Sequence, residues 1–367
     1  MDLNPRNWNV LGKSALPPTK IFSMKILQST LYVTRENAYL RQDGESVDVR
    51  LDGKSLGRFP LINLESIVTI GWDIAASPAL LGACADQGIA VSFLNPHGKF
   101  LAAVHGFPHG NVLLRRKQHR VADNTKDSLD IARRCIQAKF ANCRTLLRRA
   151  AREAKTPELA ESLGLCADIH HNRISETLRA ENADMLRGIE GDTAAHYFRS
   201  FNNLITSPDN KMRLYGRSRR PPRDPVNAVL SFLYTLLAHD CRSACAAAGL
   251  DPQIGFYHAD RPGRPGLALD LMEEFRPVFA DRVALSLINR RQLNSKDFQF
   301  FENGAVLLSE DARKTLLQVW QERKREEITH PILGEKMPLG LVPLMQARLL
   351  ARHLRGDFEH YLPFLWK

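Results

Sequence analysis

The N-terminal third of the chain has the residue pattern of a small β structure. Between residues 24 and 109 it carries short runs rich in β-branched and aromatic residues, among them TLYV, AYLRQ, SVDVRL and SIVTIG. Asp43-Gly44 and Asp52-Gly53 punctuate these runs, and such dipeptides are typical of tight hairpin turns. The spacing therefore predicts short strands, some of them joined in hairpins.

The pattern then changes, and this change sets the fold class. One Ala- and Leu-rich helix is expected over 77–87 and one buried strand over 89–95. Further along, Leu, Ala and Arg recur at helical spacing, and only 298–309 has the pattern of another hairpin. We therefore predict an α+β fold. A small N-terminal β domain with one helix spans 24–109, and a larger, mainly α-helical C-terminal domain spans 110–367.

Composition and the absence of long apolar segments restrict the class of protein. The chain has 44% hydrophobic and 25% charged residues, which is ordinary for a globular protein. It has no run of about 18 apolar residues, so a membrane-spanning helix is excluded. Residues 1–23 lack the features of a secretory signal and are interpreted as a disordered or added extension, so we expect a cytoplasmic protein. The six cysteines form no C-x-x-C pair, which favours reduced, buried thiols.

Basic residues give the first indication of a partner. The formal net charge is +11, and the segment 111–155 carries 13 Lys and Arg residues against four acidic ones. A second segment, YGRSRRPPRDP, is an arginine-rich loop stiffened by prolines. Arginine presents a planar fork of donors to phosphate, so both segments predict contact with a nucleic-acid backbone. The arginines assigned to this contact are Arg115, Arg116, Arg217, Arg219, Arg220, Arg223, Arg261 and Arg264.

Carboxylates and a histidine stand close together in GFYHADRPGRPGLALDLMEEFRP, residues 255–277. The second half is expected to be a helix with an apolar stripe, and Asp270 and Glu273, three residues apart, share a neighbouring face. Like charges one turn apart are tolerated on a solvated surface or around a shared cation. Taken alone, this pair favours a solvated face, and His258 taken alone favours a structural role.

A further acidic residue, Glu190, lies between Gly188 and Gly191 in LRGIEGDTAAHYFRSF, residues 186–201. An acid beside glycines can mark the start of a helix, where negative charge is favourable. It can also mark a place where a bulky ligand comes close to the backbone. The residues themselves leave both interpretations open.

Together these segments resemble a known family, the CRISPR-associated integrase and endonuclease of spacer acquisition, which is the first of the Cas proteins (Cas-one). The resemblance runs from about Met24 to beyond Asn303. It rests on GIEGDTAAHYF, RRPPRDPVNAVLSFLY and GFYHADRPGRPGLALDLMEEFRP standing in that order. The last motif is most similar to members from type I systems of the I-C kind. The resemblance implies that the helical domain is the catalytic one.

By this resemblance Glu190, His258 and Glu273 match the metal-binding positions of the family, and Asp270 matches an acidic position that supports the site. Two carboxylates and one imidazole suit Mn²⁺ or Mg²⁺, with the nitrogen favouring Mn²⁺ in vitro. Asp270 is expected to act as a hydrogen-bond acceptor or as a ligand of a second ion. Some members carry aspartate where Glu273 stands. Close relatives often carry serine where Gly266 stands, so a capping side chain of the catalytic helix is expected to be missing.

The resemblance also implies a reaction and its partners. The 3′-hydroxyls of a short duplex attack phosphodiesters at the ends of CRISPR repeat DNA, an exchange that agrees with the absence of a P-loop motif. With water as nucleophile the same centre would cut branched or single-stranded DNA, as a stand-alone metal nuclease would. The expected partners are double-stranded and branched DNA, a second copy of the chain and the second Cas protein (Cas-two), in a heterohexamer. The alternative is a catalytically inactive DNA-binding scaffold.

Overall fold

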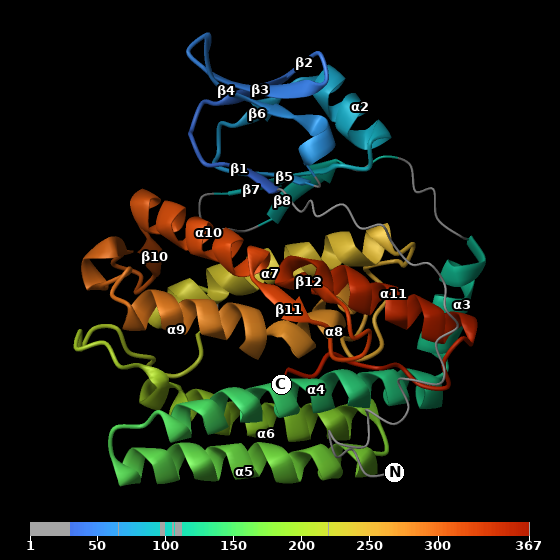
Figure 1. The fold of residues 1–367 in the computed structure, drawn as a ribbon, viewed down its shortest axis with the longest axis vertical. Coiled ribbons are helices and arrows are strands. Elements are labelled where there is room, and N and C mark those ends of the chain that lie inside the picture. Colours follow the sequence, from blue (N-terminus) through green and yellow to red (C-terminus); the bar gives the residue numbers. More distant parts are fainter. Residues whose placement is uncertain are drawn as a thin grey trace.

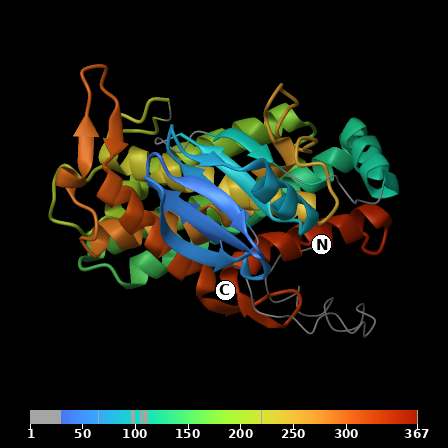
Figure 2. The same cartoon turned by 90° about the horizontal axis from the view of Figure 1, so that it is seen from above.

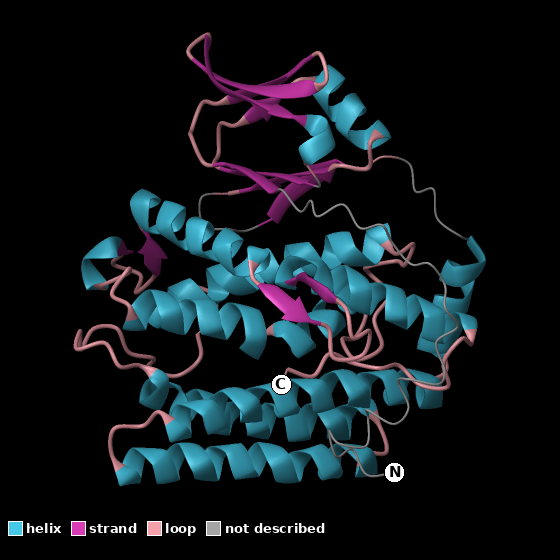
Figure 3. Ribbon diagram, viewed as in Figure 1, coloured by secondary structure: helices cyan, strands magenta, loops and turns pink. Residues whose placement is uncertain are grey.

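Strands dominate the first part of the described chain and helices the remainder, as Figure 3 shows by colour. The computed structural model (Figure 1) describes residues 30–64, 66–95, 100–104, 106, 112–218 and 220–366. The predicted α+β class is confirmed. The extension predicted over residues 1–23 lies outside the described residues. The boundary at residue 109 stays a prediction, because residues 107–111 also lie outside them.

The first of two four-stranded sheets is mainly parallel. Its order is β1 (Thr30–Val33), β5 (Ser66–Ile70), β7 (Ala90–Leu94) and β8 (Phe100–Val104). The first three strands run parallel, whereas β8 is antiparallel to β7. Parallel neighbours need a crossover connection, and the segment that contains α2 (Pro78–Asp86) forms one between β5 and β7.

The second sheet contains the two predicted hairpins. Its order is β4 (Lys54–Pro60), β3 (Ser46–Leu51), β2 (Tyr39–Asp43) and β6 (Ala75–Ala76). In the turn between β3 and β4, Asp52 and Gly53 have φ of 49° and 78°, the left-handed values that a two-residue type I′ turn requires. The turn between β2 and β3 consists of Gly44 and Glu45, one residue later than predicted.

The first sheet is covered on both faces. Neighbouring residues of a strand point to opposite faces, and on β5 Ile67 joins a core with the second sheet, where Leu40 and Val47 lie. Val68, beside Ile67, joins the large core of the helical part instead. Figure 2, seen from above, shows the strands lying across the helices. The strand-rich part is therefore attached to the helical part by buried apolar contact.

Nine α-helices form most of the described chain beyond residue 111; α7 is buried over most of its length, and α8 almost entirely. In α7, 14 of the 23 residues are buried, and in α8 nine of the ten. A helix that is buried on all sides belongs in the middle of a core. The helices are α3 (Val112–Asp123), α4 (Thr125–Arg152), α5 (Pro157–Arg179), α6 (Ala183–Ser200), α7 (Pro225–Ala247), α8 (Gly266–Phe275), α9 (Arg282–Asn289), α10 (Glu310–Arg325) and α11 (Val342–Arg355).

Capping side chains fix where most of these helices begin. Asn124, Thr156, Asn182, Asp224 and Ser309 each accept a hydrogen bond from a backbone N–H of the first turn that follows. Such a bond satisfies one of the four amide groups that a helix start leaves without a partner.

Short elements connect the helices, and they include the predicted hairpin. β9 (Phe298–Phe300) and β10 (Val306–Leu308) pair antiparallel, which confirms the hairpin expected over 298–309. A second hairpin, which the sequence analysis does not anticipate, pairs β11 (Glu327–Thr329) with β12 (Lys336–Pro338). A π-helical turn (Pro277–Asp281) continues α8 into α9. The remaining short turns are Leu61–Asn63, Phe201–Leu204, Ser295–Asp297 and Leu339–Leu341.

Charge interrupts even the longest described helix. α4 has 28 residues, yet Lys and Arg recur along it. Among the helices that the structure describes, none is both long enough and apolar enough to cross a membrane.

Two histidines belong to the core. His170 of α5 is 1% exposed, and His330, which follows β11, is fully buried. Burial lowers the pKa of each imidazole to about 4. The unfolded chain then binds more protons than the folded chain between about pH 6.5 and pH 4, so these residues make stability fall as the pH falls through that window.

A His330→Asn variant isolates one of these effects. We compare the free energy of unfolding of the parent with that of the variant. The parent-minus-variant difference should fall by roughly 3 kcal/mol from pH 6.5 to pH 4, because one pKa unit corresponds to about 1.4 kcal/mol. Urea denaturation at a series of pH values measures it. His119→Asn, at a half-exposed histidine, is the matched control. A parent-to-variant difference that does not change with pH would contradict the prediction.

Candidate active site

Residues that lie far apart in the sequence meet in the middle of the helical part. Glu190 lies on α6, Glu273 on α8, and His258 in the loop before α8. His258 Nε2 is 3.9 Å from Glu273 Oε1. Lys139 of α4 joins the two acids, because its Nζ forms ion pairs with Glu190 Oε1 and, at 2.8 Å, with Glu273 Oε2. The structure thus brings together the three residues that match the metal-binding positions, with one ammonium group between the carboxylates.

Glu273 is a buried acid that its surroundings keep ionised. It is 3% exposed, and Arg276 Nη2 lies 2.9 Å from its Oε1. Burial by itself would raise the pKa of this carboxyl, but the positive charges of Arg276 and Lys139 outweigh burial and lower the pKa to about 2. Glu273 therefore carries a negative charge at any pH at which the protein works.

Asp270 holds the loop that carries His258. It is 1% exposed, and its Oδ2 accepts hydrogen bonds from the backbone N–H groups of Phe256 and Tyr257, at 2.5 and 2.9 Å. Its Oδ1 accepts from the backbone N–H of His258 at 2.9 Å and from His258 Nδ1 at 2.7 Å. Both oxygens are occupied, which supports the acceptor role and not that of a ligand to a second ion. Because Nδ1 must donate, Nε2 is the free acceptor, and it faces Glu273.

Two sequence expectations for these acids are wrong. The solvated face that Asp270 and Glu273 favour when taken alone does not exist, since α8 is buried on nearly every side. Glu190 does not mark a helix start, because it lies in the middle of α6, whose cap is Asn182. Its neighbour Gly191 is exposed, and apart from its chain neighbours and the nearby backbone of α6, no atom of the described chain comes within 4 Å of a Cβ placed there. The open side of the site is thus at Glu190.

Gly266 has a different role from the one predicted. It is the first residue of α8, and the preceding Pro265 provides no side-chain cap. Backbone carbonyls accept from the first amide groups of the helix instead. Gln253 O accepts from Gly266 N at 3.1 Å, and Pro252 O accepts from Leu267 N at 3.1 Å. A Cβ at position 266 would meet Gln253 O at 2.7 Å. The missing cap is therefore replaced by a close backbone crossing that only glycine allows.

The chemistry of the donor set fits a divalent cation. Two carboxylates and an imidazole are ligands that Mn²⁺ and Mg²⁺ accept. Glu273 Oε2 is buried and accepts no hydrogen bond from any described residue, although the Lys139 ammonium lies close to it. As the side chains stand, however, no three His, Cys, Asp or Glu groups among the described residues are close enough together to hold a metal ion. Metal ligation by Glu190, His258 and Glu273 therefore stays a prediction.

Two cations of the site were missed by the sequence analysis. Lys139 was counted with the surface cations of 111–155, but it is buried on α4 between Ala138 and Phe140. Arg276, three residues after Glu273, was not assigned any role. A basic residue on the apolar side of a helix is the signal that could have identified Lys139, because lysine is rarely buried unless it is paired. Both cations line a cavity of about 20 Å³, which is enough for one water molecule.

Comparison with known proteins identifies the family. The family model described as CRISPR associated protein Cas1 matches residues 31–322. The chain belongs to the Cas1 family. It is 54% identical over 351 residues to CRISPR-associated endonuclease Cas1 2 of Rhodospirillum rubrum, which covers 94% of this chain and 100% of the relative. It is 48% identical over 344 residues to CRISPR-associated endonuclease Cas1 1 of Chlorobaculum tepidum, with the same coverage.

Solved structures show the same Cas1 fold at lower identity. A CAS1 protein from Thermotoga maritima aligns with a TM-score of 0.78 at 23% identity, over 92% of this chain and all of that one. A casposase bound to integration product aligns with a TM-score of 0.77 at 21% identity, over 90% of this chain and 91% of that one. At this identity the likeness concerns the fold alone.

The arginines assigned to nucleic-acid contact do not share one environment. Arg217 is half-buried: it donates to Asn227 Oδ1 and packs over the rings of Phe198 and Tyr234. Its contact with nucleic acid stays a prediction. Arg115 is half-buried, and its Nε donates to the carbonyl of Gly249 at 3.3 Å. Arg264 is also half-buried, and Arg219 lies outside the described residues. The exposed members are Arg116, Arg220, Arg223 and Arg261.

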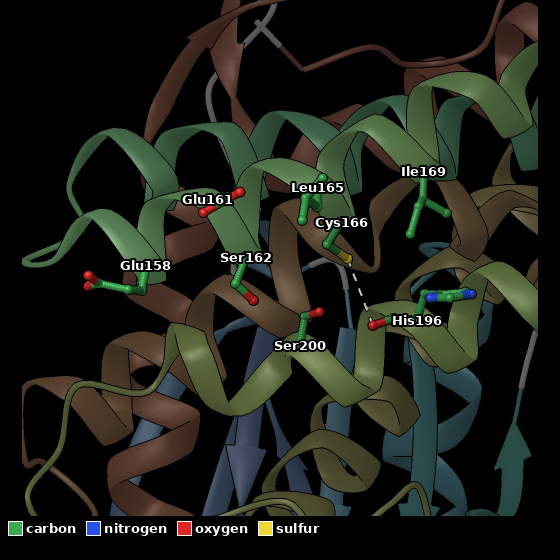
Figure 4. Close-up of a pocket in the computed structure, with 8 residues that line it drawn as sticks. All are labelled: Glu158, Glu161, Ser162, Leu165, Cys166, Ile169, His196 and Ser200. Atoms are coloured by element: carbon green, nitrogen blue, oxygen red, sulfur yellow. Dashed lines mark hydrogen bonds between the residues drawn. The ribbon is translucent and has the colours of Figure 1, made fainter.

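A surface pocket of about 360 Å³ between α5 and α6 is separate from the candidate active site. Figure 4 shows its lining, which includes Glu158, Cys166 and His196. The Cys166 thiol donates to the carbonyl of His196. His196 stands in the same motif as Glu190, but none of the residues that line the pocket is one of the three assigned to metal binding.

Asp270→Asn tests the support of the His258 loop. The amide presents a donor to groups that themselves donate, so we expect the free energy of unfolding to fall by about 3 kcal/mol. Urea denaturation measures this change. Asp260→Asn, at an exposed acid of the same loop, is the matched control and should change stability by less than about 0.5 kcal/mol. Equal losses in the two variants would contradict the role given to Asp270.

Proposed function

We propose that this chain is a metal-dependent DNA integrase and endonuclease, which inserts spacers into a CRISPR array and cuts branched or single-stranded DNA. The observation that carries the proposal is the meeting of Glu190, His258 and Glu273 beside two cations, the buried Lys139 and the partly buried Arg276. Supporting it, the similar Rhodospirillum rubrum protein is named an endonuclease, and a protein of the same fold is a casposase bound to integration product.

The reaction joins a 3′-hydroxyl to a phosphodiester, so the site has to activate a weak nucleophile and stabilise added negative charge. Glu190, His258 and Glu273 would hold Mn²⁺ or Mg²⁺, and the bound ion would supply a Lewis acid able to polarise the phosphate and lower the pKa of the hydroxyl. Lys139 and Arg276 place two fixed positive charges at the same position, where they stabilise charge that grows on phosphate oxygens.

Asp270 and the glycine beside Glu190 contribute orientation and access. Asp270 keeps the His258 ring turned with Nε2 toward Glu273. Exposed Gly191 leaves room for a DNA backbone to approach Glu190. One phosphodiester is exchanged for another, so no nucleotide triphosphate is required.

Glu190→Ala and His258→Ala test the proposal directly. We expect each to reduce cutting of branched DNA and joining of a 3′-hydroxyl duplex to a repeat-bearing plasmid at least 100-fold in Mn²⁺ or Mg²⁺, because each removes a metal ligand. DNA affinity should change less than about threefold. Glu181→Ala and His171→Ala, at exposed positions, are the matched controls.

Two results would contradict it. Equal loss of DNA binding and of strand joining in folded variants would mean that the residues act through affinity. Activity that does not respond to divalent ions would favour the alternative, a catalytically inactive DNA-binding scaffold.

The proposal includes partners. We infer a homodimer that joins Cas2 in a heterohexamer on DNA. Supporting this, a Cas6-RT-Cas1–Cas2 complex aligns with the chain with a TM-score of 0.78. Large apolar side chains are also exposed on the strand-rich part, among them Leu56, Ile62 and Trp72. The joining assay, run with and without the partner protein, tests the assembly; joining that is equally fast in both would argue against it.

Salt dependence tests the basic surface. We expect affinity for duplex DNA to fall steeply as the salt concentration rises, with a log–log slope of about −0.9 for each phosphate contacted. The double variant Arg220→Ala/Arg223→Ala should make the slope shallower by about 2, whereas Lys54→Ala on β4 should leave it unchanged. Fluorescence anisotropy across a salt series measures the slopes. A flat dependence for the parent would remove the basic-surface argument.

A further inference from the structure

The C-terminal segment returns to the candidate active site after α11. It runs from Gly356 to Trp366, and Figure 1 places its end beside α4. The guanidinium groups of Arg282 and Arg323 both lie over the ring of Trp366, at 5.6 and 5.3 Å from its centre. Phe364 is 1% exposed and packs at 5.7 Å against Phe275, the last residue of α8. The end of the segment, with Tyr361 and Phe364, is therefore part of the core, and it lies against the helix that carries Glu273.

Glu274 is the centre of this contact. Its side chain is fully buried, and Tyr361 donates its hydroxyl to Oε1 at 2.5 Å. Phe364 N donates to Oε2 at 2.7 Å, and Gln346 Nε2 of α11 donates to the same oxygen at 3.2 Å. The thiol of Cys135 on α4 also points to Oε1, at 3.7 Å. One carboxyl group thus connects α8, α11, α4 and the C-terminal segment.

Asn142 of α4 completes the connection from the opposite side. Its Nδ2 donates to the carbonyls of Glu274 and Phe364, at 2.8 and 3.0 Å. Its Oδ1 accepts from Trp366 N at 2.7 Å. α4 also carries Lys139, which pairs with Glu273. Two of the helices that supply groups to the site, α4 and α8, are therefore tied to each other through the C-terminal segment.

Packing alone does not require an acid at position 274. Burying a carboxyl group costs free energy, and burial raises the pKa of Glu274 to about 7. An apolar side chain would fill the same space without that cost, but it would not fix the rotation of α8 through directed contacts. Consecutive residues of a helix point about 100° apart, so the contacts of Glu274 set the direction in which Glu273 points.

We propose that Glu274 is a positioning residue, which fastens the C-terminal segment onto α8 and thereby holds Glu273 in the orientation that binds the divalent ion. The inference rests on the proposed function, because it takes Glu273 as a metal ligand. On this proposal the C-terminal segment affects metal binding indirectly, through the orientation of Glu273. None of its own residues contacts the ion.

The test measures Mn²⁺ binding to the full-length chain, without DNA, by the electron paramagnetic resonance signal of free Mn²⁺. We call the hydrogen bonds from Tyr361, Phe364 and Gln346 to Glu274 the clamp. Glu274→Gln places an amide group against these donors, and we expect Mn²⁺ affinity to fall about 10- to 100-fold, as for other partners that orient a metal ligand. Tyr361→Phe keeps the ring and removes one hydrogen bond, so we expect a fall of about 3- to 10-fold. Glu302→Gln and Tyr215→Phe, both exposed, are the matched controls and should bind Mn²⁺ as the parent does.

Hydrogen exchange by mass spectrometry of the C-terminal peptide, run on the same variants, shows whether the clamp has loosened. We expect faster exchange in both clamp variants. A merely structural role would lower the melting temperature while leaving Mn²⁺ affinity at 20 °C unchanged.

The outcomes separate the two levels of inference. Suppose that folded Tyr361→Phe shows faster hydrogen exchange in the C-terminal peptide but binds Mn²⁺ as tightly as the parent. This result overturns the positioning role of Glu274 and leaves the proposed function standing. It does so even if Glu274→Gln fails to fold. Parent-like exchange in Tyr361→Phe also overturns it, because the segment is then held by other contacts. A parent that binds no Mn²⁺ overturns the proposed function and the clamp together.

Discussion

Three buried carboxyl groups on one short helix organise this structure. Asp270, Glu273 and Glu274 lie on the ten-residue helix α8 and are 1%, 3% and 0% exposed. An unpaired charge in a protein interior costs several kcal/mol, so each of the three needs donors or cations from elsewhere in the chain. Asp270 is satisfied by the preceding loop, Glu273 by Lys139 and Arg276, and Glu274 by the C-terminal segment. The positions of these distant elements follow from that requirement.

Adjacent glutamates on this helix have opposite electrostatic surroundings. Both are buried, and burial raises the pKa of each. At Glu273 the guanidinium of Arg276 and the ammonium of Lys139 reverse the effect and bring the pKa to about 2. At Glu274 the partners are neutral donors, which reduce the effect of burial without reversing it, and the pKa is about 7. One position is suited to an ionic contact with a cation, the other to a hydrogen-bonded connection.

Local features of the fold could be predicted from the sequence, whereas long-range ones could not. The Asp52-Gly53 turn and the hairpin over 298–309 depend on a few neighbouring residues and are confirmed. The parallel pairing of β1 with β5 joins Thr30 to Ser66, and no local signal marks it. The candidate site shows the same division. Its motif residues were found through the resemblance, but the burial of Asp270 was not, since it depends on elements packed around α8.

The loop before α8 shows why glycine fits at position 266. Glycine at position 266 looks like the loss of a cap when only the helix start is considered. In the structure the chain at Gln253 passes so close that a Cβ on Gly266 would meet its carbonyl at 2.7 Å, and a Cβ on Gly255 would meet Asp270 Oδ2 at 2.8 Å. Gly255 precedes the residues whose N–H groups Asp270 accepts. The two glycines thus allow the loop to approach α8 closely enough for Asp270 to bind it, and a serine at position 266 would require that loop, and with it His258, to shift.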